Sequence, residues 1–254
     1  MSDVAKPLVY LVLGATGSGR REVLADLIAA GLEEKDRAAV MLSDAEAPDA
    51  TEGPLGAITR WQWLEGAIVG TLPEGATHVF FVVDGRRNPI DQIEVFKPWL
   101  EAQGGKLARS LCVVNFQLVA AHPSLLGWYE ACIHFADVVF LNRREGVENK
   151  VVSDFLAHFK KLYFPCLFEM VKDGQVKNPA LVLEPEARRM THVFDEEQNW
   201  VFTNAEGEEI DEQEETKGAD DNEEIEAKPE EDPYFERMNG GRRLKPIPDI
   251  GKFL

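Results

Sequence analysis

The sequence is poor in the residues that build metal centres, disulfides and membrane spans. It holds three cysteines and five histidines in 254 residues, without a Cys-x-x-Cys cluster or a spacing typical of zinc ligands. The cysteines, Cys112, Cys132 and Cys166, stand alone among apolar residues, so we expect buried, reduced thiols. No apolar run could cross a bilayer, and the polar N-terminus does not resemble a signal peptide. These absences predict a cytoplasmic protein with no metal-binding residues and no membrane partner.

Positive charge is also scarce. The chain has 27 Lys and Arg against 45 Asp and Glu, a formal net charge of −18, which argues against a nucleic-acid partner. Fifteen of the acidic residues lie in 205–232, beside only two lysines, and this composition predicts an acidic, disordered linker. Residues 233–254 regain basic, aromatic and aliphatic side chains. We therefore expect a docking peptide there, for a protein partner, a twin subunit or this domain itself.

Apolar runs alternate with helical patterns along the first 175 residues. Strands are predicted at 8–13, 38–43, 78–84, 111–116, 138–142 and 166–170, and helices at 23–31, 61–71, 89–104, 125–135 and 147–162. This order predicts an α/β domain over 1–175 with a doubly wound, mostly parallel sheet of the P-loop NTPase type. A hairpin extension is expected over 176–204, with two short strands about a polar turn in 192–202.

A glycine-rich loop follows the first strand and opens the first helix. The run Gly14-Ala-Thr-Gly-Ser-Gly-Arg-Arg21 has the glycine spacing of a P-loop, G-x-x-x-x-G-K-[ST]. Arg20 replaces the lysine and Arg21 replaces the residue whose hydroxyl binds Mg²⁺. Backbone N–H groups at a helix N-terminus still favour an anion. The loop therefore predicts phosphate binding without efficient hydrolysis, through Gly14, Thr16, Gly17, Ser18, Gly19, Arg20 and Arg21.

Two other interpretations of the loop stay open. Gly14-Ala-Thr-Gly17 is similar to the opening of short-chain dehydrogenases, although the third glycine falls at 19 rather than 20. No tyrosine is followed four residues later by a lysine, which counts against that catalytic class. The loop is also compatible with a purely structural glycine turn.

A second segment carries a family resemblance. His134-Phe-Ala-Asp-Val-Val-Phe-Leu-Asn-Arg-Arg-Glu145 resembles the "ADxxxLNKxD" segment of the CobW-like P-loop GTPases, and the order of motifs is similar over most of residues 8–170. The resemblance implies that Asn142, Arg143 and Glu145 surround a guanine base, with Arg143 stacking on the ring. The family's Cys-x-Cys-Cys motif is absent, which removes the basis for a metallochaperone.

Each of these residues also has a structural interpretation. Asn142 is compatible with a strand-terminal cap, and Arg143 and Glu145 with solvated charges. Asp84 stands where a strand-terminal acid would reach Mg²⁺ through water, yet Asp followed by glycine is also a common way to leave a strand. Arg86 and Arg87 either extend a phosphate-binding rim or pair with surface acids.

The sequence as a whole predicts a degenerate, CobW-like member of the P-loop GTPases. We expect it to bind a purine nucleotide, GTP or GDP, with little or no hydrolysis, as a regulatory or sensor module. Any enzymatic activity would be weak GTP hydrolysis, and Mg²⁺ is not expected as a firm cofactor. The alternatives are a nucleotide-free scaffold for protein interaction and an NAD(P)-binding Rossmann protein.

Overall fold

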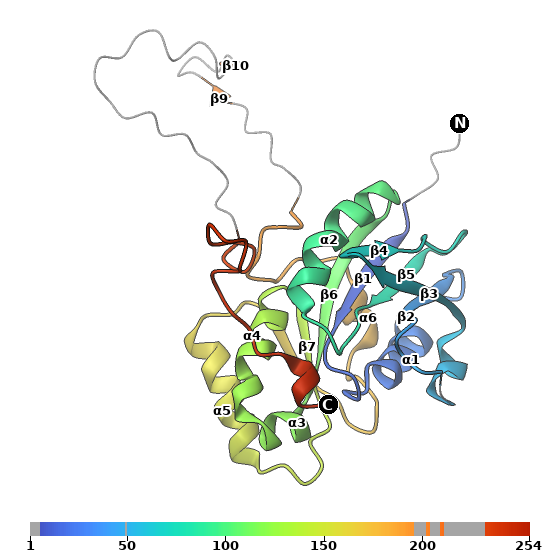
Figure 1. Ribbon diagram of the computed structural model, residues 1–254. Coiled ribbons are helices and arrows are strands. Elements are labelled where there is room, and N and C mark those ends of the chain that lie inside the picture. Colours follow the sequence, from blue (N-terminus) through green and yellow to red (C-terminus); the bar gives the residue numbers. More distant parts are fainter. Residues whose placement is uncertain (1–5, 49, 196–201, 204–208, 211–231) are drawn as a thin grey trace, which may run out of the picture.

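The computed structural model describes residues 6–48, 50–195, 202–203, 209–210 and 232–254. Eight strands form one sheet in the order β4-β3-β2-β5-β1-β6-β7-β8 (Figure 1). Every neighbouring pair is parallel except β3 and β4. The strands are β1 Leu8–Leu13, β2 Ala38–Ser43, β3 Ala57–Leu64, β4 Ala67–Val69, β5 His78–Val82, β6 Lys106–Asn115, β7 Val138–Asn142 and β8 Leu167–Met170. The predicted mostly parallel α/β fold is confirmed, with the four strands expected in the centre all lying inside the sheet.

Helices cover both faces of the sheet. They are α1 Arg20–Gly31, α2 Pro89–Ala102, α3 Phe116–Ala121, α4 Leu126–His134, α5 Asn149–Lys161 and α6 Pro179–Leu183, with short 3₁₀ turns η1 Ala50–Leu55, η2 Pro123–Leu125 and η4 Ile250–Lys252. Strand β1 shows how the layers divide, because Leu11 faces a cluster containing α2, α4 and α5, while Val12 faces α1 and α6. A strand buried on both faces needs apolar residues at every position, as this one has. Within the described ranges, no helix has the length and apolar composition of a membrane span.

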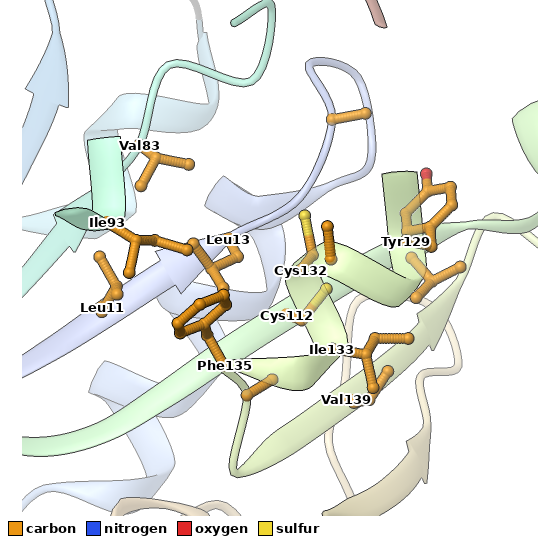
Figure 2. Close-up of a cluster of buried hydrophobic side chains, with 14 of the residues drawn as sticks. Leu11, Leu13, Val83, Ile93, Cys112, Tyr129, Cys132, Ile133, Phe135 and Val139 are labelled. Carbon is orange, nitrogen blue, oxygen red and sulfur yellow. The ribbon is translucent and has the colours of Figure 1, made fainter. Parts of the chain in front are cut away.

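The core between β1, β6 and α4 contains two of the three cysteines. Figure 2 shows Cys112 of β6 and Cys132 of α4 among Leu13, Phe135 and other apolar side chains. Cys166 is buried as well, and all three thiols are free, as expected. Burial raises the pKa of the Cys166 thiol to about 12. These cysteines therefore behave as small core side chains, because the reactive thiolate form is disfavoured.

The expected helix over 61–71 is wrong. The segment contains the end of β3 and all of β4, which form an antiparallel hairpin. Glu65 and Gly66 make its two-residue turn with φ of 51° and 81°, the backbone that a tight hairpin requires. Trp61 is fully buried, stacks on Phe81 with centroids 4.9 Å apart and donates its indole N–H to the Val82 carbonyl at 3.0 Å. Packing of this side chain against the sheet therefore overrides the helical spacing of the apolar residues.

The segment after β8 packs against the domain as far as the structure describes it. Arg109 of β6 is fully buried and donates to the carbonyls of Leu181 and Val182 at 3.1 Å, which fixes α6 on the sheet. The first arm of the hairpin expected over 192–202 is absent. Residues 192–195 form a turn closed by a 3.0 Å hydrogen bond from Asp195 N to His192 O, and the two side chains also pair.

The remainder of that expected hairpin, residues 196–201, lies outside the described residues. Beyond it, β9 Phe202–Thr203 pairs antiparallel with β10 Glu209–Ile210. Apart from β10 and Asp232, the predicted acidic linker over 205–232 also lies outside the described residues.

Residues 232–254, here called the C-terminal strap, lie on the domain beside α2 and α4 (Figure 1). Tyr234 and Ile250 are 2% and 1% exposed and belong to the main core cluster. Arg243 pairs with Asp91 at 2.7 Å and with Glu94, both on α2. The basic segment thus meets an acidic surface of its own domain, and an interaction of this segment with another protein stays a prediction.

Asp232 anchors the start of the strap. Its carboxylate accepts hydrogen bonds from His134 Nε2 at 2.8 Å and from Thr191 Oγ1 at 2.6 Å. Burial disfavours the charged form, but these bonds outweigh burial and lower the pKa of Asp232 below its ordinary value. A depressed carboxyl pKa stabilises the fold above the unfolded pKa and loses this contribution as pH falls through the folded value. Anchoring by Asp232 is therefore complete at neutral pH.

Replacing Tyr234 with alanine tests whether the strap belongs to the cooperative fold. We expect Tyr234→Ala to lower the free energy of unfolding by about 3 kcal/mol, since it removes a buried aromatic side chain. Leu244→Ala is the matched control, because Leu244 is 51% exposed in the same strap and should change stability by less than about 0.5 kcal/mol. Urea unfolding measures both, and equal stability of the two variants would show that the strap does not contribute to the core.

Candidate phosphate-binding site

The glycine-rich loop between β1 and α1 has a backbone that requires glycine. Gly14, Gly17 and Gly19 have φ of 128°, 79° and 86°, which side-chain-bearing residues rarely adopt. A Cβ on Gly14 would collide with the Val113 carbonyl, and one on Gly19 would collide with the Asn142 amide. The loop is therefore both left-handed at three positions and closely packed against the neighbouring strands.

Three strand ends hold this loop in place. The Gly85 carbonyl beyond β5 accepts a 3.2 Å hydrogen bond from Thr16 N. Asn142, the last residue of β7, donates to the Ser18 carbonyl at 2.9 Å, and Asn115 at the end of β6 donates to the Gly17 carbonyl at 3.4 Å. The structure thus brings the loop together with the carboxyl ends of β5, β6 and β7, where ligands bind in open α/β sheets.

Arg20 and Arg21 both pair with one carboxylate that the sequence analysis did not single out. Arg20 donates to Glu46 Oε1 and to the Val83 carbonyl at 2.7 Å, and Arg21 donates to Glu46 Oε2 at 3.1 Å. The three residues are between 4% and 8% exposed. The charges at the lysine and hydroxyl positions of the loop are therefore balanced from within the protein.

A second layer of charge surrounds this cluster. Arg21 Nη1 lies 3.3 Å from Glu52 of η1, and Glu52 also accepts a 2.5 Å hydrogen bond from Arg60 of β3. Arg60 in turn donates to the Glu46 carbonyl at 2.8 Å. Five charged side chains thus join the loop to the segment that links β2 and β3.

The Asp84 carboxylate is hydrogen-bonded within the turn after β5. Asp84 is 2% exposed, and its carboxylate accepts hydrogen bonds from Arg86 N at 3.0 Å and from Arg87 Nε at 2.9 Å. Neither contact leads to the phosphate loop, so Asp84 serves the Asp-Gly turn in this structure. Its proposed contact with a nucleotide stays a prediction.

The residues of the expected base-binding segment separate in space. Asn142 holds the loop, as described, and Arg143 pairs with Glu22 of α1 at 2.5 Å. Arg143 has φ of 52°, which turns its side chain back over the start of that helix. Glu145 is exposed and lies beyond the residues that line the cavity. The structure places Asn142 and Arg143 beside the loop, and the contact of Glu145 with a base stays a prediction.

A cavity of about 280 Å³ opens beside the loop. Its wall carries four arginines, Arg20, Arg21, Arg86 and Arg143, and two acids, Glu22 and Glu46. The excess of positive charge favours an anion. The buried hydroxyl of Thr16 in the same wall has no hydrogen-bond partner among the described residues. A phosphate group would supply the acceptor that this hydroxyl and the loop backbone can use.

Neither a protein-family model nor a curated protein sequence matches the chain. Among solved structures, it is similar to the zinc-bound YjiA GTPase from E. coli, with 13% identity over 72% of this chain and 67% of that one and a TM-score of 0.40. A zinc-bound triple mutant of YjiA matches with 13% identity over the same shares of the two chains and a TM-score of 0.41. An LAO/AO transport system kinase matches with 13% identity over 65% of this chain and 53% of that one and a TM-score of 0.42. Matches at this level assign no ligand, so membership in the CobW-like family stays a prediction.

Gly85 supplies a test of the loop's packing. A Cβ on Gly85 would lie 2.5 Å from Thr16 N and 2.7 Å from the Gly14 carbonyl, so Gly85→Ala should destabilise the protein by about 2 kcal/mol. Gly53→Ala is the control, because nothing lies within 4 Å of the added atom. Thermal unfolding compares the two, and a Gly85→Ala variant as stable as the control would show that the turn and the loop do not support each other.

Proposed function

We propose that this chain binds a purine nucleotide, GTP or GDP, through its phosphate groups and hydrolyses it little or not at all. The observation that carries the proposal is the cavity beside the loop, whose wall holds four arginines against two acids. Left-handed glycines shape the loop, and the hydroxyl of Thr16 faces no acceptor among the described residues. Both features suit an anion at the N-terminus of α1.

We attribute the expected lack of hydrolysis to the residues that stand at the two Mg²⁺-binding positions. Mg²⁺-assisted phosphoryl transfer uses a loop hydroxyl and a strand-terminal acid to hold the metal. Here Arg21 occupies the first position, and the Asp84 carboxylate is engaged by Arg86 and Arg87. Binding without turnover suits a regulatory or sensor module of the CobW-like type.

One observation favours a second candidate, a scaffold that works without nucleotide. Glu46 already pairs with Arg20 and Arg21, and Glu52 pairs with Arg21, so the loop is held by internal ion pairs. A domain of this kind would act through its surfaces and respond to no nucleotide. The measurement below separates the two functions, and it includes NAD(P)⁺ as the ligand of the dinucleotide alternative.

Thermal shift with a nucleotide panel tests the proposal. GDP, GTP, ADP, ATP and NAD(P)⁺ would each be added in buffer containing EDTA. We expect a guanine or adenine nucleotide to stabilise the protein, by about 2.7 kcal/mol when its concentration reaches 100 times Kd. Arg143→Ala should reduce this shift, because Arg143 lines the cavity and its pair with Glu22 is still partly exposed. Arg242→Ala, an exposed arginine in the strap, is the control.

The panel has three informative results. A shift with purine mononucleotides that Arg143→Ala weakens supports the proposal. Protection by NAD(P)⁺ alone supports the dinucleotide alternative. Protection by no ligand, with a cooperative unfolding transition in its absence, supports the scaffold.

Phosphate release from GTP tests the absence of turnover. With Mg²⁺ present, we expect the native protein to release phosphate more slowly than about 10⁻⁴ s⁻¹, the lower end of rates for unassisted GTPases. A variant that restores the lysine and the hydroxyl of the P-loop carries Arg20→Lys and Arg21→Thr. It also needs Glu46→Gln, because the buried Glu46 carboxylate would otherwise lose its arginine partners. Native turnover at about 10⁻² s⁻¹ would contradict the proposal.

A further inference from the structure

Glu46 is held on the turn after β2 by contacts from two directions. Its N–H donates to the Ser43 carbonyl at 3.1 Å, and its carbonyl accepts from Arg60 at 2.8 Å. The carboxylate is capped by Arg20 on one oxygen and by Arg21 on the other. The side chain is therefore fixed by its backbone and by both of its oxygens.

The Glu46 carboxylate lies beside the two loop positions that contact the outer phosphates and the metal ion in a P-loop. In a P-loop, the residue at position 20 supports the outer phosphates, and the residue at position 21 holds the metal ion that bridges them. Both of these side chains converge here on Glu46, and Arg20 also reaches the Val83 carbonyl at the end of β5. Glu46 thus places a negative charge where a terminal phosphate and its metal ion would meet.

A buried negative charge at this point has two effects on a bound nucleotide. It repels an additional phosphate in a poorly screened environment. It also pairs with Arg20 and Arg21, so both guanidinium groups are already engaged before a ligand binds. The rest of the cavity keeps Arg86 and Arg143 on its wall. Of these, Arg86 donates to the Ala45 carbonyl and Arg143 pairs with Glu22, so a terminal phosphate beside Arg20 and Arg21 would have to compete with the Glu46 carboxylate.

We propose that Glu46 makes the site select nucleotides with one or two phosphates, bound without a divalent cation, over the magnesium complex of a triphosphate. This inference rests on the proposed nucleotide binding and adds the phosphate number and the residue that sets it. Glu22, the other acid of the cavity wall, pairs with Arg143. Its partner is Arg143 rather than Arg20 or Arg21, so it supplies a matched comparison.

Isothermal titration calorimetry with GMP, GDP and GTP, and with the adenosine series, tests the selection. Each titration is run in EDTA and in Mg²⁺, on the native chain and on Glu46→Gln and Glu22→Gln. In the native chain, GDP should bind at least ten times more tightly than GTP, and Mg²⁺ should change its Kd less than twofold. Glu46→Gln should raise GTP affinity at least tenfold with a smaller effect on GDP. Glu22→Gln should change both nucleotides to the same extent.

The outcomes distinguish the inference from the proposed function. GTP binding as tightly as GDP to the native chain overturns the selection and leaves nucleotide binding in place. Absence of binding in every titration overturns both. Where Glu46→Gln unfolds, Glu46→Asp keeps the charge, and it should retain the preference for GDP. A preference for Mg²⁺-GTP in that variant would also overturn the inference.

Discussion

The ion pairs of Arg20 and Arg21 with Glu46 are the constraint on which the site depends. Removing charged groups from water is costly unless they are paired, and these three side chains are almost fully buried. They join the first turn of α1 to the segment after β2, and Glu52 and Arg60 extend the connection to β3. A loop of the P-loop type thereby obtains its charge balance from the protein, which in the usual arrangement comes from a ligand and its metal ion.

Much of the fold could be predicted from the sequence because buried parallel strands leave a strong local signal. Leu8–Leu13 and Val138–Asn142 are apolar at nearly every position, and only a sheet covered on both faces buries such runs. The hairpin around Trp61 was missed, since its apolar spacing also fits a helix. What decides the outcome is a long-range contact, the stacking of Trp61 on Phe81, and a local pattern carries no information about it.

The site could be predicted only in part, for a similar reason. The glycines of the loop are recognisable because the backbone conformation that requires them is set locally. Asn142 could be placed near the loop because it ends a parallel strand. Glu46 lies in a polar connection, and nothing in its neighbours marks it as a partner of residues 25 and 26 positions earlier. The one available signal was electrostatic, since two consecutive arginines at a buried helix start require a counter-charge. The turn after β7, where Arg143 is left-handed, is a further local feature that the sequence analysis did not predict.

A double-mutant cycle between Arg20 and Glu46 tests the central claim most directly. The unfolding free energies of the native chain, Arg20→Met, Glu46→Gln and the double variant are measured without nucleotide. If the buried pair holds the loop, each single variant should be strongly destabilised, and the coupling energy should be about 2 kcal/mol or more. A coupling energy below about 0.5 kcal/mol, typical of an exposed ion pair, would contradict the claim that this interaction organises the site.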